Sequence, residues 1–197
     1  MHIIGLVGGV ASGKSLVAEQ LRQLGAAVLD GDRAGHEVLR EPDVRAAIVE
    51  RFGASVLDAD GEVDRRAVGR IVFAPPPDGP PHLEWLEQLT HPRIIERLER
   101  QAEELTRSGT KAAVLDAPVM LKGGWHKMCN SILFIDAPRE LRLERAKTRG
   151  WTEDDFVRRE AAQEPIERKR AFAEAEIDNS GAPEATFEQI KQYWTTI

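Results

Sequence analysis

Eight residues near the start of the chain, Gly-Gly-Val-Ala-Ser-Gly-Lys-Ser at positions 8–15, complete the pattern of a phosphate-binding loop. The apolar run at 3–7 predicts a buried strand before the loop, and Val17, Leu21 and Leu24 share one face of a helix after it. A helix that begins where such a loop ends directs its free N–H groups and the positive end of its dipole at an anion. We therefore expect a phosphate site here, in preference to a glycine-rich turn that binds nothing.

The residues of this loop have separate expected tasks. Gly8 and Gly13 let the backbone approach the phosphates, and the successive amides form a concavity that suits an anion. Lys14 can reach the outer phosphates as a point charge, while the Ser15 hydroxyl can ligate Mg²⁺. The residues of the loop expected to bind a nucleotide include Gly8, Gly9, Ser12, Gly13, Lys14 and Ser15.

The composition narrows the class of protein. At 197 residues the chain can bury one sizeable core, which fits a single α/β domain with a small excursion. The net charge of −6 argues against a nucleic-acid partner, since affinity for a phosphate backbone needs clustered positive charge. The single cysteine, Cys129, precludes an intrachain disulfide and fits a reducing compartment. No leader and no apolar run of bilayer length is found, so we expect a cytoplasmic protein without a membrane partner.

Five short apolar segments predict strands, at residues 3–7, 26–29, 112–115, 131–135 and 175–177. Most of them are almost continuously apolar, as in parallel sheets that are buried on both faces. Helical periodicities lie between them, including a helix that we expect to begin at His91-Pro92. Strands that alternate with helices predict a doubly wound five-stranded parallel sheet, with its ligand site at the carboxyl ends of the strands.

Two stretches fall outside this predicted core. Residues 34–88 have helical patterns without a core strand, and the prolines between 75 and 81 predict a surface loop. Residues 149–172 are highly charged and helical in propensity, with few core-forming residues. Such a segment is either a solvated helical face or a mobile lid whose arginines stabilise charge on a γ-phosphoryl group, and we favour the lid.

Three aspartates are the candidate acids for phosphoryl transfer. Asp32 is the candidate base for an acceptor hydroxyl, and Asp30 is the candidate near the Mg²⁺ water shell, because both follow the second predicted strand. The alternative for Asp32 is to cap the following helix, although no capping box supports that role. Asp116 ends the third predicted strand, where it either associates with Mg²⁺ or forms a turn before Ala117-Pro118.

In its ordered motifs the chain resembles the dephospho-coenzyme A kinase family nearly end to end. The resemblance rests on residues 4–15, 29–32, 64–66, 72–73, 91–92, 116–118, 143–145 and 177–181. It implies a P-loop NTPase-type kinase that transfers the ATP γ-phosphate to the ribose 3′-hydroxyl of dephospho-coenzyme A, with ATP and Mg²⁺ as cofactors. It also implies one P-loop kinase domain over residues 1–197, with 34–88 as a helical acceptor-binding excursion and 149–172 as the lid.

Further site residues are implied by their positions in these motifs. The implied catalytic residues are Lys14, Asp32 and Arg145, the last a phosphate-contacting arginine at the root of the lid. Asn179 is implied to lie near the adenine of ATP. Arg65 and His91 are implied to bind the acceptor together with Asp32, and their alternatives are a surface ion pair and a polar residue at a helix start.

The chain also departs from the usual family pattern. Val7, Ala11 and Leu16 stand where the family usually has Thr, Gly and Thr, and the sequence around Lys122 is unusual as well. Ala11 and Leu16 remain among the expected nucleotide-binding residues. The alternatives to a dephospho-coenzyme A kinase are another small-molecule or nucleotide kinase and a nucleotide-hydrolysing regulator, and no Asn-Lys-x-Asp segment supports a GTPase. We expect a monomer or a weak homo-oligomer.

Overall fold

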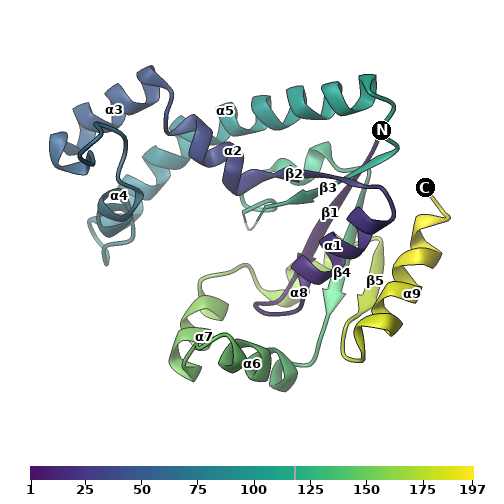
Figure 1. The fold of residues 1–197 in the computed structure, drawn as a ribbon. Coiled ribbons are helices and arrows are strands. Elements are labelled where there is room, and N and C mark those ends of the chain that lie inside the picture. Colours follow the sequence, from purple (N-terminus) through teal and green to yellow (C-terminus); the bar gives the residue numbers. More distant parts are fainter. Residues whose placement is uncertain (118) are drawn as a thin grey trace. The chain divides into compact units, whose positions relative to one another are not determined.

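The structure, a computed structural model, describes residues 1–117 and 119–197 and divides into two compact units (Figure 1). The phosphate-loop unit comprises Met1–Leu29 and Gln101–Ile197, and the helical unit comprises Asp30–Arg100. Each unit has buried apolar side chains of its own, such as Leu21 in the first and Ile48 in the second. A separate core is what allows each unit to be compact by itself.

A five-stranded sheet forms the centre of the phosphate-loop unit. Its strands are β1 (His2–Gly8), β2 (Ala27–Asp30), β3 (Ala112–Asp116), β4 (Ser131–Asp136) and β5 (Ala175–Asp178), in the spatial order β2-β3-β1-β4-β5. β1 runs parallel to β3 and β4, and β4 runs parallel to β5. Each predicted strand is present, and the expected parallel α/β sheet is confirmed. Because β1 is central, the loop that follows it leaves from the middle of the carboxyl edge.

Two helices cover one face of this sheet, α1 (Lys14–Gln23) and α9 (Pro183–Trp194), which lie side by side (Figure 1). Leu6 of β1 points to this face and belongs to the same buried cluster as Leu21 of α1 and Ile190 of α9. Burial of an aliphatic side chain of this size stabilises a fold by about 1.5–3 kcal/mol. The cluster therefore fixes where α1 begins relative to the end of β1.

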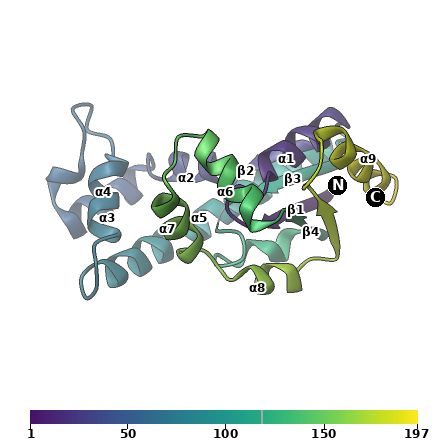
Figure 2. The same cartoon turned by 90° about the horizontal axis from the view of Figure 1, so that it is seen from below.

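The remaining helices of this unit are η2 (Trp125–Met128), α6 (Arg139–Thr148), α7 (Glu153–Ala161) and α8 (Ile166–Ala171). α6 and α7 lie side by side (Figure 2). On the sheet face opposite α1, the guanidinium of Arg170 in α8 lies 4.3 Å from the ring centre of Phe134. Packing is close there, because a Cβ atom on Gly5 would lie 2.9 Å from the sulfur atoms of both Cys129 and Met120 and would displace these side chains.

The helical unit contains α2 (Gly31–Val38), α3 (Pro42–Phe52), η1 (Ala54–Val56), α4 (Arg65–Val72) and most of α5 (Gly79–Arg107). Val38, Val44 and Ile48 are fully buried and Ile94 is nearly so. Ion pairs join its helices at the surface, since Arg97 of α5 donates to Glu41 at 2.7 Å and to Glu37 of α2 at 3.2 Å. This unit is thus an all-helical body with a small apolar core.

Two expectations about α5 are wrong. The helix begins at Gly79, so Pro80 and Pro81 lie in its first turn and not in a surface loop. The N–H groups of a first turn have no partner within the helix, and proline loses nothing there. The helix also does not begin at His91-Pro92 but continues through Pro92. Near this proline the Arg93 side chain donates to the Leu89 carbonyl at 2.9 Å.

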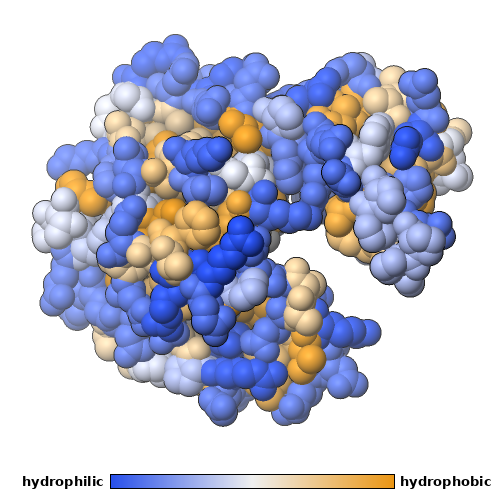
Figure 3. Space-filling view, turned by 180° about the vertical axis from the view of Figure 1, so that it is seen from behind, coloured by the Kyte–Doolittle hydropathy of each residue, from blue (hydrophilic) through white to orange (hydrophobic). Residues whose placement is uncertain are grey.

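The surface is consistent with the charged composition. Seen from behind, it is mostly hydrophilic, with hydrophobic residues in scattered patches (Figure 3). In the part of the chain that the structure describes, no helix is long and apolar enough to cross a membrane.

Candidate phosphate-binding site

Residues 9–13 form the loop that joins β1 to α1. At Gly8, which ends β1, and at Gly13, which ends the loop, the surroundings leave no room for a larger side chain. Gly13 caps α1 in the left-handed region with φ 100°, and a Cβ atom there would lie 1.9 Å from Nδ2 of Asn179. A Cβ atom on Gly8 would lie 2.6 Å from the Ile135 carbonyl oxygen and from Oγ of Ser12. These contacts give the physical reason for glycine at both ends of the motif.

Ala11 is the one residue other than glycine with a positive φ, 58°, within residues 1–117 and 119–197. The left-handed conformation costs an L-residue with a Cβ atom roughly 1–2 kcal/mol, and glycine avoids most of that cost. The loop backbone is therefore strained at Ala11.

The carbonyl groups of the loop are held by side chains that come from distant elements. The Val10 carbonyl accepts from Arg142 of α6 at 3.2 Å. The Ser12 carbonyl accepts from Nδ2 of Asn179 at 2.7 Å and from Arg145 at 3.4 Å. Protein donors therefore hold these two carbonyl groups in place.

The amide groups of the loop are in the opposite situation. Among the described residues, no acceptor takes a hydrogen bond from the N–H groups of Ala11, Gly13, Lys14 or Ser15. Gly13, Lys14 and Ser15 stand at the start of α1, where the helix dipole is positive. Paired carbonyl groups and unpaired amides together make an anion-binding concavity.

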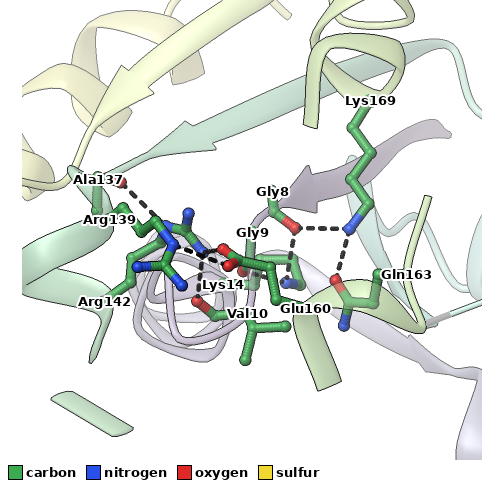
Figure 4. A network of polar contacts seen from close by, with 10 residues as sticks. All are labelled: Gly8, Gly9, Val10, Lys14, Ala137, Arg139, Arg142, Glu160, Gln163 and Lys169. Carbon is green, nitrogen blue, oxygen red and sulfur yellow. Dashed lines mark hydrogen bonds and ion pairs between the residues drawn. The ribbon is translucent and has the colours of Figure 1, made fainter. Parts of the chain in front are cut away.

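Two lysines converge on the start of the loop (Figure 4). Nζ of Lys14 donates to the carbonyl groups of Gly8 and Gly9 at 3.4 and 3.3 Å. Nζ of Lys169 in α8 donates to the same Gly8 carbonyl at 3.2 Å and to Oε1 of Gln163 at 2.5 Å. Burial lowers the pKa of both ammonium groups, and the positive charges around each act in the same direction. Together these effects bring the pKa of Lys169 to about 8.

Arg142 connects the loop to α7. It is 5% exposed, donates to the Ala137 carbonyl at 3.2 Å, and forms an ion pair of 2.8 Å with Glu160, which also pairs with Arg139 (Figure 4). These two arginines hold the pKa of the Glu160 carboxyl below its usual range, in spite of partial burial, which acts to raise it. The Val10 carbonyl of the phosphate loop, the Arg142 guanidinium and the Glu160 carboxylate of α7 thus form one continuous polar network.

Asn179 is buried, and both ends of its side-chain amide are engaged. Nδ2 donates to Ser12 as described, and Oδ1 accepts from the Thr186 hydroxyl at 2.9 Å. Arg145 in turn donates to the Asn179 carbonyl at 2.8 Å. Asn179 therefore supports the end of the loop from β5, and its place near adenine stays a prediction.

A Mg²⁺ ion fits this site only if the nucleotide supplies most of its ligands. No group of three acidic, histidine or cysteine side chains suited to a metal occurs in the described part of the chain. Ser15 is exposed in the first turn of α1, and the half-buried Asp116 at the end of β3 is close enough to Lys14 to oppose the lowering of its pKa. One hydroxyl, one nearby carboxylate and bound phosphates are the donor set that Mg²⁺ takes in nucleotide sites. Ser12 Oγ, by contrast, is buried without a partner among the described residues.

A cavity of about 330 Å³ opens beside the loop within the phosphate-loop unit. Apolar side chains from β1 and from the chain after β3 form part of its wall. Its polar wall comes from Lys14, Lys122, Gln163, Glu164 and Lys169. A pocket with a mainly apolar wall and several converging polar groups is the usual form of a small-molecule site.

The other predicted site residues belong to the helical unit. Asp30 caps α2 and accepts from the Arg33 amide at 2.8 Å, so the capping role considered for Asp32 falls to Asp30 instead. Asp32 lies in the first turn of α2, exposed, and its carboxylate has no hydrogen-bond or ion-pair partner among the described residues. Arg65 is the exposed first residue of α4, and His91 is half-buried within α5.

The charged segment at 149–172 forms α7 and α8. We expected few core-forming residues in it, and Phe156 is the buried residue of α7, packed against Val10 and Ala146. The guanidinium groups of Arg139 and Arg142 lie over its ring at 5.3 and 5.6 Å from the centre. Movement of this segment as a lid stays a prediction, and α7 is anchored to the phosphate loop in this structure.

Comparison with known proteins identifies the family. A sequence profile described as dephospho-CoA kinase matches residues 2–184. The dephospho-CoA kinase of Carboxydothermus hydrogenoformans is 37% identical over 192 residues, which cover 96% of this chain and 91% of the relative.

The chain belongs to the dephospho-CoA kinase family.

Solved structures share the fold of this chain. A protein from Thermus thermophilus, 32% identical, superimposes with a TM-score of 0.79 over 100% of this chain and 97% of its own. The dephospho-CoA kinase of Campylobacter jejuni, 22% identical, gives a TM-score of 0.66 over 99% of this chain and 96% of its own, a likeness of fold alone. As a member of this kinase family, the chain uses ATP.

Some residues of the phosphate-binding site in this chain were not predicted from the sequence. Arg142, Glu160 and Gln163 were not expected to touch the loop or its cations. A signal for Arg142 exists, because it precedes Arg145 by three residues and so shares its helical face. Gln163 and Glu160 give no such signal, since their partners lie in elements that only the fold brings together.

Proposed function

We propose that the chain transfers the γ-phosphate of ATP to the ribose 3′-hydroxyl of dephospho-coenzyme A. The observation that carries this proposal is the loop after β1, whose carbonyl groups are paired and whose amides are free at the start of α1. Membership of the dephospho-CoA kinase family supports dephospho-coenzyme A as the acceptor of the phosphate.

In the proposed reaction, the loop amides bind the nucleotide phosphates, and Lys14 turns from the Gly8 and Gly9 carbonyls to the transferred group. Arg145, which now donates to two loop-side carbonyl groups, keeps positive charge beside it. Ser15 and Asp116 are the proposed residues for Mg²⁺, with Asp30 contributing through its water shell. When bound, Mg²⁺ would neutralise charge on the phosphate oxygens.

Asp32 is the proposed base, and it suits that role because its exposed carboxylate is not occupied by helix capping. It accepts the proton of the 3′-hydroxyl while the hydroxyl oxygen bonds to the γ-phosphorus and the bond to the β-phosphate oxygen breaks, which releases ADP. Arg65 and His91 are proposed to bind the acceptor in the helical unit. Residues 149–172 are proposed to close over the phosphates and exclude water.

The test is a panel of acceptors at fixed Mg·ATP: dephospho-coenzyme A, adenosine, AMP and shikimate. We expect the highest kcat/KM for dephospho-coenzyme A, because remote parts of a long acceptor supply binding energy that positions the reacting hydroxyl. AMP, which lacks the pantetheine arm, should lose kcat as well as affinity. A smaller acceptor that equals dephospho-coenzyme A would contradict the proposal, and ADP release without any acceptor would indicate a hydrolase.

A further inference from the structure

Lys169 and Lys14 share a single hydrogen-bond acceptor, the Gly8 carbonyl, at 3.2 and 3.4 Å (Figure 4). Both lysines also line the cavity of about 330 Å³ at the carboxyl end of β1. Two ammonium groups that donate to one oxygen lie close enough together for one phosphate group to bridge them. The second lysine is therefore as close to the phosphate site as the lysine of the sequence motif.

The ammonium group of Lys169 is held in place by two hydrogen bonds and still has an N–H group to donate. An ammonium group has three N–H donors, and Lys169 uses two of them, on Gly8 and on Gln163. The side chain is only 9% exposed, so its position does not depend on solvent. A fixed cation with one donor left over, at the wall of a cavity, is arranged to receive an anion.

The charged groups around Lys169 also favour binding of an anion there. Lys14 and Arg142 face it and disfavour a further positive charge, while Glu160 and Glu164 act in the opposite direction. Burial is the largest effect, and with these neighbours it lowers the pKa of Lys169 to about 8. Several buried cations beside one another are costly, and an anionic group bound between them removes much of that cost.

The arginines of the same charged segment are mostly engaged elsewhere. Arg158 pairs with Asp155, Arg168 pairs with Glu164, and Arg170 pairs with Asp136 and Glu176. Arg159 lies over the ring of Trp151 at 4.2 Å. Lys169 is the cation of α8 that reaches the phosphate loop.

We propose that Lys169 binds the terminal phosphate of the nucleoside triphosphate beside Lys14 and thereby distinguishes ATP from ADP. This inference rests on the proposed kinase function and names a further residue of its site. Lys169 also keeps the Gly8 carbonyl paired when Lys14 turns towards the phosphates.

Binding of a β,γ-imido analogue of ATP and of ADP, measured by calorimetry, tests the proposal with Lys169→Met and Lys169→Arg. We expect Lys169→Met to weaken binding of the triphosphate roughly 10–100-fold, as for loss of a charge-assisted hydrogen bond, and to change ADP binding less than about threefold. Lys169→Arg should retain most of the preference. Lys147→Met is the matched control, because Lys147 is exposed and pairs only with Glu153 in the described part of the chain.

Proton uptake gives a second readout that a structural lysine would not move. A bound phosphate raises the pKa of Lys169, so at pH 8 the wild type should take up as much as about half a proton with the triphosphate. Calorimetry in two buffers of different ionisation enthalpy measures this number. Lys169→Arg should lose the uptake attributable to this residue, because arginine is already charged.

An unchanged ratio of triphosphate to ADP affinity in Lys169→Met, with only a lower Tm, would overturn the inference. If Lys169→Met does not fold, undiminished proton uptake in Lys169→Arg would overturn it equally. Neither result bears on whether wild-type protein phosphorylates dephospho-coenzyme A. Conversely, loss of discrimination in a protein that accepts another alcohol would support Lys169 and contradict only the proposed acceptor.

Discussion

In the helical unit several arginines meet carboxylates near the surface, whereas beside the phosphate loop several cations donate to main-chain carbonyl groups. Arg93 and Arg97 both pair with Glu41. Lys169 and Arg145 instead donate to the carbonyl groups of Gly8, Ser12 and Asn179. A carbonyl group satisfies a donor without cancelling its charge, so the phosphate-loop unit keeps a positive potential for an anion.

The acids show the converse arrangement. Glu160, beside the phosphate loop, is paired with two arginines, while Asp32 at the start of α2 has no protein partner among the described residues. Each unit thus leaves available the polar group that a different reactant needs. A phosphate needs cations, and an acceptor hydroxyl needs a base.

The largest effect should follow from removing the motif lysine. We expect Lys14→Ala to lower phosphoryl transfer roughly 10³–10⁵-fold, because the cation that neutralises the transferred group is lost. Stability should change little, since Lys14 makes only long contacts of 3.3 and 3.4 Å to the loop carbonyl groups. Coupled ADP release and circular dichroism measure the two quantities. Turnover near the wild-type rate would show that the positive potential of this unit does not serve transfer.

The next largest effect should follow from removing the unpaired carboxylate of the helical unit, that of Asp32. We expect Asp32→Asn to lower kcat roughly 10²–10⁴-fold, with a smaller change in ATP affinity, because a positioned base is removed. The Tm should stay the same, since α2 is capped by Asp30. The comparison for stability alone is Asp30→Ala, which should lower the free energy of unfolding by about 1 kcal/mol through loss of that cap. A normal kcat in Asp32→Asn would remove Asp32 from the mechanism.

Much of this arrangement was visible in the sequence, and the reasons are local. Residues 3–15 specify the strand, the loop and the helix by apolar runs and glycines, so the phosphate site could be predicted. Pro80 and Pro92 led to a wrong start for α5, because the free-energy cost of a proline depends on its position within a helix. The partners of Arg142, Val10 and Glu160, escaped prediction since only the fold brings them to this side chain. Charge composition says how many cations a segment has, not which of them face a carbonyl group.

The smallest effects separate the two kinds of arginine directly. Arg142→Met should lower the free energy of unfolding by about 2–3 kcal/mol, because it leaves the Val10 carbonyl unpaired and removes one partner of Glu160, which keeps Arg139. Arg97→Met should cost about 1 kcal/mol or less, since its ion pairs are partly exposed and screened by water. Methionine preserves much of the aliphatic length in both variants, so the difference reports the polar contacts. Urea denaturation at low and high salt measures it: salt should weaken the contribution of Arg97 and leave that of Arg142 nearly unchanged. Equal losses with equal salt dependence would mean that the cations of the phosphate-loop unit are no more committed to the fold than those at the surface of the helical unit.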